Sequence, residues 1–187
     1  MRKKRLNIVE CPKLEDNEMI DGNLEYRLLI DLLDKKQREE AETMGKVIAV
    51  CISEKRGTVK KNIQECNVVE GYGLENDAHG GNWHRQVSLL SYDRVKEFNE
   101  KGGNVTDGDF GENLLIEGYD FKTLPVGTRF KCNDVILELT QVGKKCHSHC
   151  EIFHRVGDCI MPREGVFTRV IHGGKIKVGD EFVICSE

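Results

Sequence analysis

The sequence lacks any apolar run close to the roughly 20 residues that a helix needs to cross a bilayer. It begins with basic residues in MRKKRLNIVECPKLEDNEM, but the apolar stretch and small-residue cleavage site of a signal peptide do not follow. These two absences argue against a membrane protein and against a secreted protein. We therefore expect the chain to work in the cytoplasm.

Aromatic residues are also scarce, at 6% of the chain, and their arrangement does not resemble a platform for stacking RNA bases. The formal net charge is −4, so no overall positive charge attracts a phosphate backbone. We therefore expect no nucleic-acid partner. What is present is an ordinary globular composition, because 39% of the 187 residues are hydrophobic and 32% are charged. This suits one domain with an appendage.

Residues 1–44 form the expected appendage, a charged N-terminal extension with one amphipathic helix. Leucines recur at helical spacing in NLEYRLLIDLLDKKQREEAETM, where Asn23 can serve as the N-cap. The helix could pack on the domain, join a partner helix or be weakly ordered, and we expect no catalytic role for it. A β-branched run follows at once, so we place the domain boundary between Met44 and Gly45.

Residues 45–187 read as a mainly β domain, in which short apolar runs alternate with turns. The strand candidates are KVIAVCIS, QVSLLS, ENLLIEG, RFKCN, VILELTQVG, GVFTRVI and DEFVICS. RVKEFNEK predicts a short helix, and GTRFKCNDVILELT predicts a hairpin that turns at Asn133-Asp134. GGKIKVGDEFVI predicts a terminal strand pair. Many short antiparallel strands with few helices predict a closed or partly open β-barrel.

The segment GKKCHSHCEIFHRVGDC gathers thiols and imidazoles directly after the strand VILELTQ. Lys144 and Lys145 precede Cys146, and neighbouring cations favour a thiolate, so Cys146 is a candidate reactive sulfur. A zinc site competes with this interpretation, because zinc prefers cysteine and histidine ligands. The spacing of Cys146 and Cys150, with two histidines between them, matches no common zinc ribbon. In a reducing compartment the eight cysteines are not by default a disulfide framework.

Three further segments carry polar side chains that a core does not need. NDAHGGNWHRQVSLLS holds Asp77, His79 and Arg85 in a glycine-rich loop that permits close approach to a ligand. TDGDFGENLLIEG places Asn113 at a strand entry, where backbone N–H groups and an amide can cradle an oxyanion. CIMPREGVFTRV offers Arg163 to a phosphate. Each segment alone also fits an ordinary loop or exposed charge, but together they favour an anionic, phosphate-bearing ligand with a soft metal or sulfur centre.

The order of these segments resembles a MOSC domain, the C-terminal domain of molybdenum cofactor sulfurases, from about Gly45 to Val183. The similar pieces are GKVIAVCIS, DAHGG followed by HRQVSLLS, DGDFGENLLIEG and KVGDEFVI. The family cysteine usually follows Thr-Gln-Pro-Arg and a proline, and the alignment selects Cys146. Here that Pro and Arg are absent, and Gly-Lys-Lys replaces them. The CHSHC and GDCIMPREGVF text looks like small stand-alone members of the family.

The resemblance implies that Cys146 carries sulfur as a persulfide or ligates the molybdenum of a bound molybdopterin cofactor. Lys144 and Lys145 would then favour its thiolate, with Cys150 or Cys159 as a resolving thiol. Arg85, Asn113 and Arg163 would hold the cofactor phosphate or its dithiolene arm. Asp77 and His79 would shape the mouth of the pocket.

The family is often labelled as binding pyridoxal phosphate, because cofactor sulfurases fuse this domain to a pyridoxal-phosphate desulfurase. A chain of 187 residues cannot also hold that domain, so we expect no pyridoxal phosphate here. We expect sulfur from a cysteine desulfurase or another donor, and molybdenum cofactor biosynthesis proteins or molybdoenzymes as partners. Two alternatives stay open: a molybdenum-dependent reductase of N-hydroxylated compounds, and a zinc-stabilised binding module without enzymatic activity.

Overall fold

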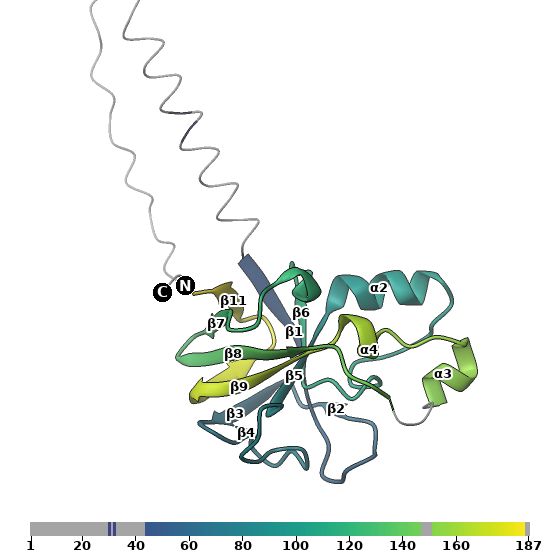
Figure 1. Cartoon of the computed structure of the whole chain (residues 1–187), viewed down its shortest axis with the longest axis horizontal. Coiled ribbons are helices and arrows are strands. Elements are labelled where there is room, and N and C mark those ends of the chain that lie inside the picture. Colours follow the sequence, from purple (N-terminus) through teal and green to yellow (C-terminus); the bar gives the residue numbers. More distant parts are fainter. Residues whose placement is uncertain (1–29, 31, 33–43, 147–150, 186–187) are drawn as a thin grey trace, which may run out of the picture. The chain divides into compact units, whose positions relative to one another are not determined.

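The computed structural model shows a closed β-barrel built from the apolar runs that follow residue 43 (Figure 1). The structure describes residues 30, 32, 44–146 and 151–185. The helix expected before the barrel therefore lies outside the described residues, apart from Ile30 and Leu32, which are both helical.

Seven strands form the ring, and the pairing of the first strand with the last one closes it. All neighbouring pairs are antiparallel except β5 and β6, which are parallel. The order around the ring is β1 (Met44–Ile52), β11 (Glu181–Ile184), β7 (Arg129–Cys132), β8 (Val135–Val142), β9 (Val166–His172), β5 (Val87–Ser91) and β6 (Leu114–Glu117).

Two smaller strand groups extend the barrel wall. β2 (Lys61–Asn62) pairs with the end of β1. A separate sheet has the order β10 (Gly174–Lys177), β3 (Glu65–Val69) and β4 (Gly73–Leu74). β3 alternates exposed and buried residues, which is the pattern of a strand with one wet face.

The strands are buried on one face or on both, depending on what covers the outside of the ring. β8 alternates, so Val135, Leu137 and Leu139 point into the barrel while their neighbours are partly exposed. β5 is buried throughout, because Leu89 belongs to the interior cluster and Leu90 to a second cluster that includes residues of α2 (Tyr92–Glu100). The continuous apolar run of β5 follows from these two cores.

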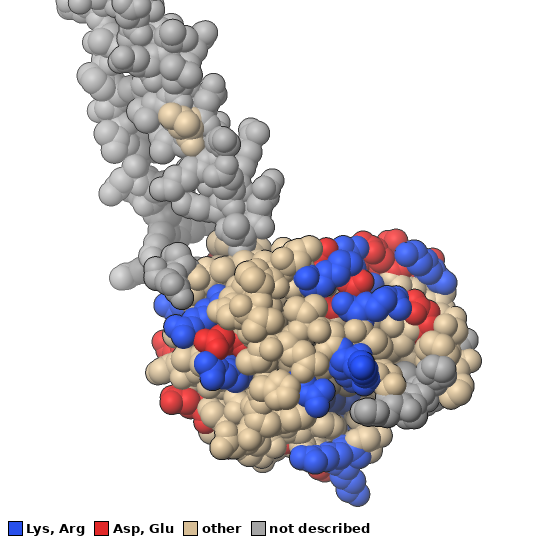
Figure 2. All heavy atoms as spheres, in the orientation of Figure 1, with Lys and Arg blue, Asp and Glu red and all other residues tan. Residues whose placement is uncertain are grey.

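Short helices connect the strands, and in Figure 1 they lie on one side of the barrel. α2 crosses between the parallel strands β5 and β6, and it buries Val95 and Phe98. Lys96 on its outer face pairs with Asp93 and Glu117, and basic and acidic side chains lie side by side in this region in Figure 2. The remaining helical elements are η1 (Phe121–Thr123), α3 (Glu151–Val156) and α4 (Met161–Glu164). In the part of the chain that the structure describes, no helix is long and apolar enough to cross a membrane.

The predicted fold class is confirmed: the protein is mainly β, the barrel is closed, and its helices are short. The hairpin predicted at Asn133-Asp134 joins β7 to β8, with Asn133 at a φ of 54°. The predicted terminal strand pair is wrong, because β10 pairs with β3 and β11 pairs with β7 and β1. The turn between them bonds to β1 instead: Gly179 N donates to Val47 O (2.8 Å), and Val47 N donates to Asp180 O (2.9 Å). The chain thus leaves one sheet and enters the other.

Candidate functional site

A cavity of about 730 Å³ opens where several loops of the barrel meet two short helices and the strand β9. It lies among the loop after β1, the loops before β5 and β6, the segment after β8, and residues of α3, α4 and β9. Most of these segments are loops on a rigid barrel, a usual place for a binding site. The lining residues are Gly57, Thr58, Val59, Lys60, His79, Trp83, Arg85, Ser88, Asp109, Phe110, Gly111, Asn113, Lys144, Lys145, Cys146, Ile152, Cys159, Met161 and Phe167.

A buried ion pair between Lys60 and Asp77 lies at this cavity. Lys60 Nζ is 2.5 Å from Asp77 Oδ1 and 2.7 Å from Oδ2, and both residues are almost fully buried. Burial alone would raise the pKa of Asp77. Hydrogen bonds from Lys60, from Ser53 N (3.0 Å) and from Asn113 hold it below its ordinary value instead. Asp77 is therefore a carboxylate, and it lies behind the lining residues rather than among them.

The backbone of Lys60 is held under the TDGDFG turn by a close contact with Gly108. A β-carbon at position 108 would lie 2.2 Å from the Lys60 carbonyl oxygen, and Gly108 has a φ of 89°. Both facts require glycine. Lys60 N also donates to Gly108 O (3.3 Å), so the turn and the lysine are fixed together.

Asn113 lines the cavity, but its side-chain amide is used within the protein. Nδ2 donates to Cys51 O and to Asp77 Oδ2, both at 3.0 Å. Oδ1 accepts from Ser88 N at 3.1 Å. Since an amide NH₂ has two hydrogens, neither is left for a ligand. Asn113 therefore acts here by orienting Asp77.

Glu112, the neighbour of Asn113, is a buried carboxyl that the sequence analysis did not single out. Its Oε1 accepts from Gly108 N (2.6 Å), while its Oε2 has no hydrogen-bond partner among the described residues. Burial, followed by repulsion from Asp107 and Asp109, raises the pKa of Glu112 to about 7. The turn above Lys60 is thus fastened by a group that titrates near neutral pH.

Arg85 presents a positive charge to the cavity between two aromatic rings. Its guanidinium carbon lies 4.9 Å from the ring centre of Trp83 and 5.5 Å from that of Phe167. Such stacking holds a guanidinium while leaving its donors available. The buried Arg85 Nε has no partner among the described residues, so it can receive an acceptor from a ligand.

The predicted thiol segment reaches the same cavity. Gly143 N donates to Gly165 O (2.8 Å) and Lys144 N to Pro162 O (3.2 Å), which fixes the chain after β8 against α4. Cys146 is exposed and lines the cavity together with Lys144 and Lys145.

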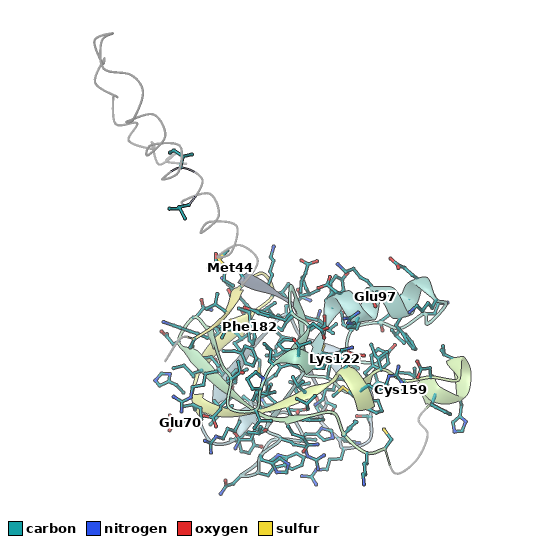
Figure 3. All side chains as sticks on the ribbon, turned by 45° about the horizontal axis from the view of Figure 1, so that its top comes forward. Met44, Glu70, Glu97, Lys122, Cys159 and Phe182 are labelled. Atoms are coloured by element: carbon teal, nitrogen blue, oxygen red, sulfur yellow. The ribbon has the colours of Figure 1, made fainter. Side chains whose placement is uncertain are left out.

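A second thiol, that of Cys159, also lines the cavity. Cys159 is labelled in Figure 3 and lies in the link between α3 and α4. Cys150 lies outside the described residues. Arg163 is not among the lining residues; it pairs with Asp158 at 2.8 and 2.9 Å.

The zinc alternative receives no support from residues 44–146 and 151–185. Within the described residues no three side chains of His, Cys, Asp or Glu converge in a way that could hold a metal ion. His147, His149 and Cys150 lie outside those residues, so zinc binding by the CHSHC segment stays a prediction.

Sequence analysis missed Lys60 and Trp83, which complete the site. Lys60 stands in KRGTVKKN, where its neighbours are exposed lysines and arginines, and nothing local marks it as buried. Its burial becomes clear only in the structure, where the buried Asp77 carboxylate supplies the partner that a buried lysine requires. Trp83 is the single tryptophan of the chain, and it stands two residues before Arg85.

Comparison with known proteins gives the class of this domain. The family model described as "MOSC domain" matches residues 75–183, more than half of the chain. The chain therefore belongs to the MOSC domain family, which is associated in general with molybdenum cofactor functions. A search of curated proteins found no match.

Solved structures of similar fold include three bacterial proteins. The YuaD protein of Bacillus subtilis has a TM-score of 0.65 at 20% identity, covering 77% of this chain and 97% of that one. YiiM of Geobacillus stearothermophilus has a TM-score of 0.57 at 18% identity, covering 76% and 75%. YiiM of Escherichia coli has a TM-score of 0.52 at 18% identity, covering 76% and 69%. At these identities the likeness is one of fold.

Proposed function

We propose that this protein binds the molybdenum cofactor in the cavity and that Cys146 is its sulfur carrier or its molybdenum ligand. One observation carries the proposal: the exposed Cys146 thiol lines the same cavity as the cationic side chains of Arg85, Lys144 and Lys145. A thiolate suits a soft metal or a sulfur atom, and the cations suit an anionic ligand.

The residues present fit such a cofactor in two respects. Arg85 has a buried Nε that lacks a partner among the described residues, and a phosphate oxygen would satisfy it. Phe110, Met161 and Phe167 give the cavity an apolar wall, which suits the flat ring system of a pterin. When bound, the cofactor would supply a metal that changes its oxidation state and exchanges sulfur ligands.

In a sulfur-transfer role Cys146 reacts with a persulfide on a donor such as a cysteine desulfurase. The Cys146 thiolate attacks the outer sulfur of the donor's R–S–SH group, a new S–S bond forms on Cys146, and the donor's S–S bond breaks. The donor leaves as the thiolate R–S⁻, and Cys146 becomes the persulfide S–SH. Lys144 and Lys145 support this step, because neighbouring cations stabilise the attacking thiolate. Cys159 lies on the same cavity and is the candidate resolving thiol.

The test compares the full chain with Cys146→Ser, Cys159→Ser and the control Cys185→Ser. Each protein is incubated with a cysteine desulfurase and free cysteine, and intact-mass spectrometry then records the gain of one sulfur atom. Elemental analysis of freshly purified protein measures molybdenum. We expect Cys146→Ser to lose the sulfur or the metal, and Cys185→Ser to keep both, because Cys185 is not among the lining residues.

Equal sulfur and molybdenum in Cys146→Ser and the unaltered chain would refute the role of Cys146. Molybdenum in the unaltered chain, together with reduction of an N-hydroxylated compound by an artificial electron donor, would instead support the reductase alternative.

A further inference from the structure

The Lys60 ammonium has three N–H groups, and the structure provides three acceptors for them. Two are the Asp77 carboxylate oxygens, at 2.5 and 2.7 Å. The third is His79 Nδ1, at 3.3 Å from Lys60 Nζ. An ammonium can only donate hydrogen bonds, so the ring nitrogen that faces it must accept.

The hydrogen bonds around Asp77 keep it a carboxylate, and this negative charge favours the ammonium form of Lys60. Asp77 receives hydrogen bonds from Ser53 N and Asn113 Nδ2 besides those from Lys60, and a carboxylate with so many donors stays ionised. Burial lowers the pKa of Lys60, but the Asp77 contacts oppose that shift. The direct distance from His79 Nδ1 to Asp77 Oδ1 is 3.8 Å, too long for a hydrogen bond.

His79 is therefore neutral near pH 7, and its single ring proton is on Nε2. Burial and then the charge of Lys60 lower its pKa below the ordinary value, because a second proton would face the ammonium. A single proton on Nδ1 would likewise point an N–H at another N–H. The remaining tautomer carries the hydrogen on Nε2.

The loop around His79 holds the residue in place at the cavity. Trp83 Nε1 donates to His79 O (3.1 Å), and Gly80 N donates to Asp77 O (3.0 Å). A β-carbon on Gly80 would lie 2.4 Å from the Tyr72 ring, so a larger residue at this position would have to displace that ring. Among the described residues, no acceptor is found for His79 Nε2.

We propose that Lys60 and Asp77 are positioning residues that fix His79 as the Nε2–H tautomer, and that this N–H donates to an oxyanion of the ligand in the cavity. Arg85 on the same lining supplies the positive charge that such an anion needs. The proposal deepens the proposed function and rests on it only for the identity of the ligand. The tautomer itself does not depend on molybdenum or on Cys146.

The tautomer is measured by nitrogen-15 NMR of the imidazole rings in the full chain, with His79→Gln to assign the signals. We expect His79 to give the pattern of a neutral Nε2–H ring at pH 7. Lys60→Met removes the donor and should give mixed tautomers or a protonated ring. Lys61→Met is the matched control, because Lys61 is the exposed neighbour of Lys60, and it should leave the pattern unchanged. A neutral Nδ1–H ring or a doubly protonated ring in the unaltered chain would overturn the proposal, whether or not Lys60→Met folds.

The ligand contact is tested by titrating the same samples with inorganic phosphate. We expect the Nε2 signal of His79 to shift in the unaltered chain and in Lys61→Met. His79→Leu, which has no side-chain donor, should bind phosphate about tenfold more weakly, the loss expected for one hydrogen bond to a charged group. An unmoved Nε2 signal at saturating phosphate, or equal affinity in His79→Leu, would refute the contact. A chain that shows the tautomer and the shift but neither persulfide nor molybdenum would refute the proposed function alone.

Discussion

The carbonyl oxygen of Lys60 lies 2.2 Å from the point that a β-carbon at position 108 would occupy. The glycine-rich turn and the buried lysine are therefore one unit, because neither can move without the other. A second glycine of the same turn, Gly111, also has a positive φ, of 80°, but a β-carbon there would meet nothing within 4 Å. Substitution of Gly111 therefore tests the cost of the positive φ alone, whereas substitution of Gly108 adds the steric contact with Lys60.

Gly108→Ala should destabilise the protein more than Gly111→Ala does. The positive φ costs either alanine about 1–2 kcal/mol in the free energy of unfolding, and Gly108→Ala also forces the backbone of Lys60 away. Urea denaturation measures both variants against the unaltered chain. Equal losses would mean that the contact with Lys60 is relaxed at little cost.

Glu112→Gln should change how stability depends on pH. The pKa of Glu112 is raised from an ordinary 4.5 to about 7, so between these values the folded chain keeps a proton that the unfolded chain releases. The contribution of Glu112 is thus fully present below about pH 4.5 and is lost as the pH rises to about 7, by about 3 kcal/mol in total.

Denaturation of the two proteins at several pH values checks this, because glutamine does not titrate. We expect the free energy of unfolding of Glu112→Gln, relative to the unaltered chain, to increase from pH 4.5 to pH 7. A difference that stays constant over this range would contradict the assignment of a neutral, buried carboxyl.

Iodoacetamide should modify Cys146 long before the cysteines of the barrel core. Cys146 is exposed, whereas Cys51 and Cys132 are buried. Burial raises the pKa of Cys132 to about 12 and that of Cys51 still further, so neither forms thiolate in the folded chain near pH 8. Peptide mass mapping after timed quenching measures each site. Early labelling of Cys51 or Cys132 would show that the barrel opens under these conditions.

The fluorescence of Trp83 should report ligands that enter the cavity. It is the single tryptophan of the chain, and it lines the cavity under the Arg85 guanidinium. An anion that binds to Arg85 changes the electric field at the indole ring of Trp83, so titration with inorganic phosphate should change the fluorescence emission. Arg85→Met should abolish most of this change, while Arg169→Met, which removes a cation that pairs with Glu138, should preserve it. A response that survives Arg85→Met would place the anion elsewhere.

The barrel could be predicted because each strand has a recognisable local sequence pattern. Runs such as VILELTQV alternate with the two-residue period of a strand, and Asn133 supplies the turn of a hairpin. The partners of β10 could not be predicted in this way. Whether GKIK folds back on the next strand depends on the hydrogen bonds of Gly179 and Asp180 to Val47, more than 130 residues away in the sequence.

The residues of the candidate site likewise divide into those that could be predicted from the sequence and those that could not. Cys146 and Arg85 could be found from composition and from the order of segments, and both line the cavity. The buried state of Lys60 could not, because a lysine among other lysines carries no local mark of burial. Asn113 was expected to contact the ligand. Instead its amide donates to Asp77 Oδ2 and to Cys51 O, so its role is to position Asp77.

The closure of the barrel by its first and last strands governs when the fold can form. β11 fills the gap between β7 and β1, with Val183 opposite both Lys131 and Met44. Until β11 takes its place, the sheet has two open edges whose backbone groups can pair with other chains. The interior is therefore sealed only after β11 has been synthesised, and loss of β11 alone would leave an open sheet that is prone to aggregate.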